Sequence, residues 1–388
     1  MRRRALGVVM LAHLAHAFTT QRLACRSSSL LLAETRRWSS SLPDHEDSRV
    51  IAIGDVHGDL NALAECLDMA GVAEWDEGRG EFRWCGGQTT VVQCGDLLDR
   101  GDDEWPVLAA LDALQLEAQD AGGELIRLLG NHEVMNACGD FRYTTPAGDM
   151  SFLPISDDVL RTLGGHWGQW ESVPQPMRTR AAAFAPGGLL ARRLAEDYRV
   201  VAKVRSTLFV HGGLTRGLLG LGENQSSSAE TAGKELWARV TSLNERSSAW
   251  LRGESAMPRE LIGPSSPIWA RHMSSPADKE VTTSSFEEIR TICDRMGVKR
   301  MVVGHTPQFT KGINSAADGR VWRIDTGMCH RYGGVAEELE ISTKAPTSGT
   351  GAPTETVRIL TRNGPVDPRE RSPELRYVPV AGSPDLFS

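Results

Sequence analysis

The chain has 388 residues, of which 40% are hydrophobic and 24% are charged, and this composition is that of a globular protein with one large domain or two small ones. The formal net charge of −7 argues against nucleic-acid binding, and no apolar run approaches the roughly 20 residues of a membrane-spanning helix. The seven cysteines show no C-x-x-C spacing, which argues against a zinc ribbon or a thioredoxin-type motif.

Residues 1–45 have the pattern of a cleavable targeting leader rather than of a folded domain. Three arginines precede a short apolar stretch that ends at an A-x-A cleavage site, Ala15-His16-Ala17. Phe18 and a segment rich in Ser and Arg but poor in acidic residues follow, as in a transit peptide. This order resembles the bipartite leader of algae with secondary plastids, so we expect a plastid protein. A mitochondrial presequence and plain secretion are the alternatives.

The folded domain is expected over residues 48–362, with insertion about 134–205 and a flexible tail at 363–388. Short β-rich runs and helical patterns alternate in its first half, which predicts a mixed α/β fold. The predicted strands cover 50–53, 81–84, 89–93 and 124–129, and the predicted helices cover 60–72 and 104–121. The insertion is too long for a simple crossover, so we expect it to lie over the site. A helix pair remote from the chemistry is the alternative.

The second half begins with a predicted strand at 208–210. Helical patterns follow at 231–251 and 285–296, and the second of these leads into a strand at 298–303. Late strands at 321–327, 335–341 and 356–360 predict a second sheet with antiparallel pairing. The small residues of 345–353 predict a linker or a hairpin loop.

Five polar clusters in the chain follow one pattern, in which a short apolar run is followed by Asp, Asn or His beside Gly. The clusters are G-D-V-H-G (54–58), G-D-L-L-D-R-G (95–101), G-N-H-E (130–133), H-G-G (211–213) and G-H-T-P (304–307). Ligand sites in α/β sheets form at the carboxyl ends of strands. The repetition therefore predicts that five strand ends converge on one site.

The residue types in these clusters indicate a metal site for phosphoryl chemistry. Asp, His and Asn suit two divalent ions of Mn, Fe or Zn better than Ca. A carboxylate can bridge two such ions, and ions about 3.5–4 Å apart can clamp both oxygens of a phosphoryl displacement. The pKa of a bridging water would fall to roughly 7, which gives a hydroxide nucleophile at neutral pH. Arginine is the expected partner of the phosphate oxygens, because its fork is bidentate.

These motifs, in this order, resemble the phosphoprotein-phosphatase branch of the calcineurin-like metallophosphoesterases. Finer features resemble the Shewanella-like protein phosphatases: Leu129 before G-N-H-E, and the stretches 134–143, 266–271 and 324–334. The resemblance implies a four-layer α/β/β/α sandwich of two mixed sheets, with a helical insertion near the active site and the metals at the ends of the strands.

The resemblance also implies a role for each motif residue. Asp55 and His57 would bind the first metal, Asp96 would bridge both, and the second metal would be bound by Asn131, His211 and His305. His132 would be a general acid that protonates the leaving oxygen, and Asp99 would orient it and keep it protonated. Substrate phosphate would be bound by Arg100 and Asn131, with Arg271 and Arg142 as further candidates. Glu133 is expected to support the turn, while Trp269 and Tyr332 would either wall the pocket or fill the core.

The predicted activity is therefore metal-dependent hydrolysis of phosphomonoesters on phosphorylated protein or peptide substrates, either at Ser/Thr or at Tyr. The bridging hydroxide would attack phosphorus in line, without a phosphoenzyme. A dinucleoside polyphosphate hydrolase shares these motifs and is one alternative. A non-catalytic scaffold with the same fold is another, and the intact set of ligands argues against it. No partner protein can be inferred.

Overall fold

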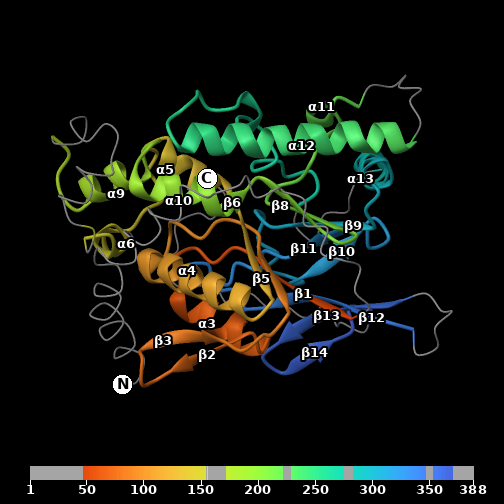
Figure 1. Cartoon of the computed structure of the whole chain (residues 1–388), viewed down its shortest axis with the longest axis horizontal. Helices are drawn as coiled ribbons and strands as arrows, with labels where there is room; N and C mark the ends of the chain where they lie inside the picture. The colour runs from red at the N-terminus through yellow and green to blue at the C-terminus, as the bar shows by residue number, and fades with distance from the viewer. Residues whose placement is uncertain are drawn as a thin grey trace.

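The computed structural model describes residues 47–153, 155, 172–221, 229–274, 283–346 and 353–369, and Figure 1 shows their arrangement. The predicted leader and most of the predicted tail lie outside the described residues. In the described part, no helix combines the length and the apolar character that crossing a membrane requires.

The first sheet has seven strands in the order β14-β13-β12-β1-β4-β5-β6. Strands β1, β4, β5 and β6 run parallel, and β12 to β14 extend the sheet with antiparallel pairs. The bounds are β1 Ser48–Ile53, β4 Thr90–Gln93, β5 Glu124–Leu128, β6 Tyr198–Arg199, β12 Glu338–Lys344, β13 Thr354–Thr361 and β14 Gly364–Val366.

The second sheet has five strands in the order β10-β11-β9-β8-β7. Its three inner strands are parallel, and its two edge strands pair antiparallel with their neighbours. The bounds are β7 Val201–Val204, β8 Thr207–Val210, β9 Arg300–Val303, β10 Asn314–Ala316 and β11 Val321–Arg323. A separate hairpin joins β2 Ala73–Asp76 to β3 Glu81–Trp84.

The two sheets pack face to face, with helices on their outer faces (Figure 1). Helices α3 (Leu60–Met69) and α4 (Glu104–Asp120) cover the first sheet, and α12 (Ala229–Leu251) and α13 (Thr283–Met296) cover the second. The remaining helices are α5 Asn131–Ala137, α6 Pro146–Ser151, α9 Met177–Phe184, α10 Leu189–Asp197, α11 Arg216–Leu219 and the 3₁₀ turn η2 Arg259–Leu261. The predicted four-layer mixed α/β fold is confirmed.

Strand β1 shows why its sequence is apolar at successive positions. Val50 and Ala52 face the core between the sheets, together with Phe209 of the second sheet. Ile51 and Ile53 point the other way, into the core beneath the helices. A strand covered on both faces needs apolar residues throughout, because its side chains alternate between two interiors. The polar residues that follow such a strand then mark the place where the layers end.

Three predictions about organisation differ from the structure. The late strands β12 and β13 belong to the first sheet, not to a second one. One side of β1 pairs with β4, and β12 pairs with its other side. The first part of the predicted tail is ordered as β14, so the domain continues beyond residue 362. The end of the predicted insertion contains β6 and β7, one strand for each sheet. Side-chain periodicity reveals a strand but not its partner.

Candidate active site

The five predicted motifs directly follow β1, β4, β5, β8 and β9, and the third runs into the first turn of α5. Their predicted site residues are buried, except for the half-buried Arg100. Five of these residues have left-handed backbone conformations, with φ of 50° at His57, 55° at Asp96, 67° at both Asp99 and Arg100, and 71° at His305. Such angles are uncommon for residues with a side chain and concentrate at functional sites. At Gly130 the backbone passes so near Asp96 that an added Cβ would lie 2.1 Å from its Oδ1 atom.

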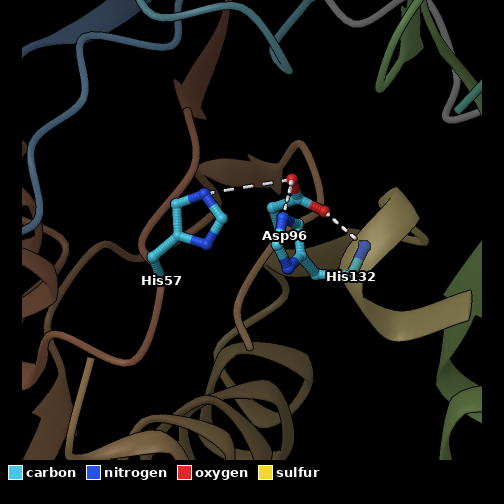
Figure 2. A group of neighbouring side chains, drawn as sticks. All are labelled: His57, Asp96 and His132. Atoms are coloured by element: carbon cyan, nitrogen blue, oxygen red, sulfur yellow. Dashed lines mark hydrogen bonds and ion pairs between the residues drawn. The ribbon is translucent and has the colours of Figure 1, made fainter. Parts of the chain in front are cut away.

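A first group of metal-ligand atoms comes from His57, Asp96 and His132, which Figure 2 shows around one carboxylate. Asp96 Oδ2 lies 4.0 Å from His57 Nε2 and 3.9 Å from His132 Nε2. Asp96 Oδ1 accepts the backbone N–H of His132 at 2.9 Å, which fixes the rotation of the carboxylate. The Nδ1 atom of His57 contacts the carbonyl oxygen of Leu98 at 2.9 Å, so its Nε2 faces the site.

A second group consists of Asp96, His211 and His305, and it shares the Asp96 carboxylate with the first. His211 Nε2 lies 3.2 Å from Asp96 Oδ2 and 3.1 Å from the side-chain oxygen of Asn131. His305 Nε2 is buried and has no hydrogen-bond partner among the described residues. Burial lowers the pKa of His57 to about 3 and that of His305 well below its usual value, so both rings carry a lone pair. An orphaned imidazole nitrogen and converging acceptor atoms fit two cations that share one carboxylate.

Asp55 belongs to neither group of three. Its carboxylate accepts the backbone N–H of His305, at 3.3 and 3.1 Å, and shares a hydrogen bond with Asp325. Burial and the nearby charges of Asp325 and Asp96 raise the pKa of Asp55 well above its usual value. Three buried carboxylates in one place are costly unless a cation offsets them. The role of Asp55 as a metal ligand stays a prediction.

Asp325 is a buried residue of the site that was not among the predicted site residues. Its stretch, Ile324-Asp325-Thr326-Gly327, follows β11 and repeats the pattern of the other five motifs. Burial raises the pKa of Asp325 to about 6, although the backbone N–H of Gly327 donates to it at 2.8 Å. The pattern of an apolar run followed by Asp and Gly could therefore have identified a sixth strand end.

His132 and Asp99 form a buried pair beside the first group. His132 Nδ1 and Asp99 Oδ2 are 2.6 Å apart. Burial lowers the pKa of His132, but the charges of Asp96 and Asp99 and this hydrogen bond outweigh it, so the pKa is raised. The arrangement can keep a proton on His132, as predicted for a general acid. Because His132 Nε2 also lies within reach of Asp96, the two roles of ligand and acid call for a separate test.

Arg100 lies between two aromatic rings next to both histidines of the first group. Its guanidinium carbon is 4.5 Å from the ring centre of Tyr143 and 4.9 Å from that of Tyr332. The Tyr143 ring lies 5.3 Å from His132, and the Tyr332 ring lies 5.5 Å from His57. Cation–π contacts orient the guanidinium without using its N–H groups, and its Nε has no hydrogen-bond partner among the described residues. This geometry suits the predicted phosphate ligand, and it makes Tyr332 a wall of the site.

The other two candidate arginines differ in their surroundings. Arg271 donates from Nη1 to the Thr306 hydroxyl at 3.2 Å, so it lies against the His305 loop. Arg142 has a side chain that is 66% exposed and makes two contacts with Asp140, at 2.9 and 2.7 Å. Phosphate binding by either residue stays a prediction. The Trp269 ring lies 6.0 Å from that of His305, at the same side as Arg271.

Glu133 supports the turns of the site, as expected. Its carboxylate accepts four backbone N–H groups, from Asp96, Leu97, Leu98 and Gly130, at 2.8–3.2 Å. These contacts tie the loop after β4 to the loop after β5. Arg180 on α9 is a further residue that the sequence analysis missed, and it donates to Asp99 at 2.7 Å. It stands in no motif, and α9 itself was not predicted.

Residues 48–309 match the family model described as calcineurin-like phosphoesterase. The chain belongs to this family. It is 34% identical to Shewanella-like protein phosphatase 2 of Arabidopsis thaliana over 317 residues, which cover 76% of this chain and 75% of that protein. It is 26% identical to Shewanella-like protein phosphatase 1 of Plasmodium berghei, over 73% of this chain and 67% of that protein. The predicted family resemblance is therefore confirmed.

The fold is also similar to solved structures. A cold-active protein-tyrosine phosphatase of a psychrophilic Shewanella species matches with a TM-score of 0.55 and 21% identity, over 81% of this chain and 80% of that one. At this level of identity the likeness concerns the fold. The family implies divalent metal ions, and the two His/Asp groups are where this phosphoesterase could hold them.

Proposed function

We propose that this phosphoesterase is a protein phosphatase, which hydrolyses phosphomonoesters on Ser/Thr or Tyr side chains. The observation that carries the proposal is the position of the Asp96 carboxylate, which is shared by two groups of metal-ligand atoms. The His132–Asp99 pair and Arg100 border the first of these groups. One site thus holds groups for cation binding, proton donation and phosphate binding. The names of its Shewanella-like relatives support the same activity.

The donor set fits two divalent ions of the Mn, Fe or Zn class. His57, Asp96 and Asp55 would hold one of them, and Asp96, Asn131, His211 and His305 would hold the other. Bound there, the ions would supply an acidified water and would offset the negative charge of the phosphate. Hydrogen bonds to backbone carbonyl oxygens hold two of the rings in place. His57 Nδ1 bonds to the carbonyl oxygen of Leu98, and His211 Nδ1 bonds to that of Cys94.

The protein's own groups would then handle the substrate and the proton. Arg100 can bind two phosphate oxygens with its fork, and the flanking rings of Tyr143 and Tyr332 prevent it from turning away. The raised pKa of His132 favours its protonated form, which can pass a proton to the leaving oxygen and so avoid the release of an unstable alkoxide. Asp99 keeps the imidazole oriented and stabilises its charged form.

The first test measures phosphate release by the full chain supplied with Mn²⁺. Matched phosphoserine, phosphothreonine and phosphotyrosine peptides are the substrates, diadenosine tetraphosphate is assayed alongside, and Asp96→Asn is the control. We expect release from at least one peptide and its loss in the variant. The same data would show whether Ser/Thr or Tyr is preferred.

Three outcomes would contradict the proposal or the site on which it rests. Release from the dinucleotide alone would make the protein a dinucleoside polyphosphate hydrolase. Binding of metal without release from any substrate would favour a non-catalytic scaffold with the same fold. Undiminished release by Asp96→Asn would show that the two groups of metal-ligand atoms do not perform the reaction.

We also propose that residues 1–45 direct the protein to a plastid. The order of a basic start, an apolar stretch, an A-x-A site and a Ser/Arg-rich segment supports this destination. Fusion of residues 1–45 to a fluorescent protein, expressed in an alga with a secondary plastid, tests it. Plastid fluorescence would support the proposal, while mitochondrial or secreted fluorescence would replace it with one of the two alternatives.

A further inference from the structure

Arg180 is completely buried and lies on α9, in the stretch that separates the third and fourth motifs. Five hydrogen bonds from its guanidinium reach four side chains, which belong to four different segments. Glu104 begins α4, Asp149 lies on α6, Asn136 on α5, and Asp99 in the loop after β4. Few side chains connect so many elements, and one of these four partners is the carboxylate that holds His132.

The contacts to Asp99 divide its two oxygens between two tasks. Asp99 Oδ1 accepts from Arg180 Nη2 at 2.7 Å and from the amide of Asn136 at 3.0 Å. Asp99 Oδ2 then contacts His132 Nδ1 at 2.6 Å. Two donors on one oxygen fix the plane of the carboxylate, so the other oxygen can point only toward the imidazole. Asn136 also accepts from Arg180 Nε at 2.7 Å, which closes the network.

The position of Arg180 is itself restrained. The rings of Phe141, Phe152 and Phe184 surround its guanidinium, with ring centres 5.9, 5.2 and 5.8 Å from the Cζ atom. Glu104 accepts from both terminal nitrogens, and it also accepts the backbone N–H of Asp99. All five N–H donors of an arginine have an acceptor here. A lysine has three donors at one point and cannot reproduce this pattern.

We propose that Arg180 is a positioning residue for the proton-donating step, through which the α9 segment sets the orientation of the Asp99–His132 pair. This inference rests on the proposed function, because the proton donor belongs to that reaction. Arg180 does not touch the reacting atoms. Arg180 holds the Asp99 carboxylate in place, and this carboxylate holds the His132 ring through Nδ1. The proton on His132 Nε2 is thereby directed at the leaving oxygen. The loss of Arg180 should therefore lower kcat most for substrates whose leaving group needs a proton.

The test compares two phosphate esters with leaving groups of different acidity. Phenyl phosphate releases a phenol with a pKa of about 10, and 2,4-dinitrophenyl phosphate releases a far more acidic one that departs without a proton. For Arg180→Lys we expect kcat to fall about 10–100-fold on phenyl phosphate, within the range of general acid catalysis, and less than about threefold on the dinitrophenyl ester.

Arg127 offers a matched control. It is also a fully buried arginine in an ion cluster, with Asp112 as a partner at 2.7 Å, and its cluster does not include Asp99. Arg127→Lys should cost stability as Arg180→Lys does, but it should change kcat for the two esters by the same factor. Equal losses on both esters in Arg180→Lys would overturn the proposal and leave Arg180 a purely structural residue.

A second measurement does not depend on activity. In the zinc-loaded full chain, the proton shared by His132 Nδ1 and Asp99 should give a far-downfield NMR signal, assigned by its absence in His132→Asn. We expect Arg180→Lys to move or lose this signal and Arg127→Lys to retain it. An unchanged signal in folded Arg180→Lys would overturn the proposal. If the wild type hydrolyses neither the esters nor the phosphopeptides, the proposed function fails, and this measurement still decides the positioning role.

If Arg180→Lys does not fold, Asn136→Ser tests the same hydrogen-bond network from its other side. It removes the second donor to Asp99 Oδ1, the bond from Asn136 to the His132 carbonyl oxygen and the acceptor of Arg180 Nε. We again expect kcat to fall more on phenyl phosphate than on the dinitrophenyl ester, and the NMR signal to move or disappear. An unchanged signal with equal losses of kcat on both esters would overturn the proposal.

Discussion

His211 Nε2 lies 3.2 Å from Asp96 Oδ2, although the two residues follow strands of different sheets. Asp96 lies in the loop after β4 of the first sheet, and His211 directly follows β8 of the second. The site is therefore built across the interface of the two sheets, and the shared carboxylate is its centre. Any change that moves one sheet relative to the other would separate the two groups of ligand atoms.

The two histidines nearest Asp96 should respond differently to substitution. We expect the wild-type chain to bind two divalent ions, His211→Asn to lose one of them, and His132→Asn to keep both. His132→Asn should lower kcat about 10²–10⁴-fold, since it removes the proton donor and not a ligand. Metal content by mass spectrometry, measured with the activity of the same samples, checks this. Loss of an ion from His132→Asn would make His132 a ligand instead, as its place in the first group allows.

The motif side chains converge, as predicted, because the motifs obey a local rule. Each motif follows an apolar run that must be a buried strand, and strand ends meet at one edge, so their convergence could be predicted from the order of residues alone. Glu133 was also interpreted correctly, since a carboxylate directly after a tight turn faces free backbone N–H groups. The alternation of strands and helices predicted the mixed α/β class, and the family resemblance implied the four layers.

Other features depend on packing between distant segments, which no local pattern encodes. In the sequence, Arg180 resembles any arginine of a short helix, and only the approach of α9 to α4 and α5 gives it its partners. The pairing of β12 with β1 was missed for a similar reason, because a strand's periodicity does not specify which edge it joins. The long 134–205 stretch was expected near the site, but its contact with Asp99 could not be predicted.

Arg100 should contribute mainly to the binding of phosphate. Arg100→Lys keeps the charge but loses the bidentate fork and the stacking between Tyr143 and Tyr332. We expect kcat/KM to fall about 10–100-fold, which corresponds to the roughly 1.5–3 kcal/mol of a hydrogen bond to a charged group. Inhibition by inorganic phosphate should weaken in parallel. Arg142→Lys is the matched control. A larger loss of kcat/KM in this control than in Arg100→Lys would indicate that Arg142, and not Arg100, binds the phosphate.

The pair of Asp59 and His330 gives the fold a modest dependence on pH. Asp59 caps α3, and its Oδ2 contacts His330 Nδ1 at 3.0 Å. The hydrogen bond to Asp59 raises the pKa of His330. Burial would raise the pKa of Asp59, but the bonds from His330 and the helix N–H groups hold it below its usual value. The His330 contribution is thus complete below its unfolded pKa and is lost as the pH rises through its folded value.

The Asp59 contribution has the opposite sign, since it is present above the unfolded pKa of an aspartate and is lost as the pH falls. The pair should therefore stabilise the fold most between about pH 4 and 6.5. We expect His330→Ala to lower the free energy of unfolding by roughly 0.2–1 kcal/mol at pH 5.5, because the His330 side chain is more than half exposed, and by nothing measurable at pH 9. Urea unfolding at both pH values measures this. An equal loss of unfolding free energy at both would show that the ion pair does not cause the effect.

Gly130 should not tolerate a side chain, because its backbone lies against Asp96. Its backbone is extended, with φ of −92°, so an alanine would meet no conformational strain. A Cβ would instead lie 2.1 Å from Asp96 Oδ1 and 2.4 Å from its backbone nitrogen, which forces the Asp96 carboxylate out of place. We expect Gly130→Ala to lose metal and at least about 10²-fold in kcat, the scale seen when a catalytic group is misplaced by about 1 Å. Gly217→Ala is the control, because the nearest atom to its Cβ would be 4.0 Å away. A Gly130→Ala protein with two bound ions and wild-type kcat would show that the loops after β4 and β5 can separate without harm to the site.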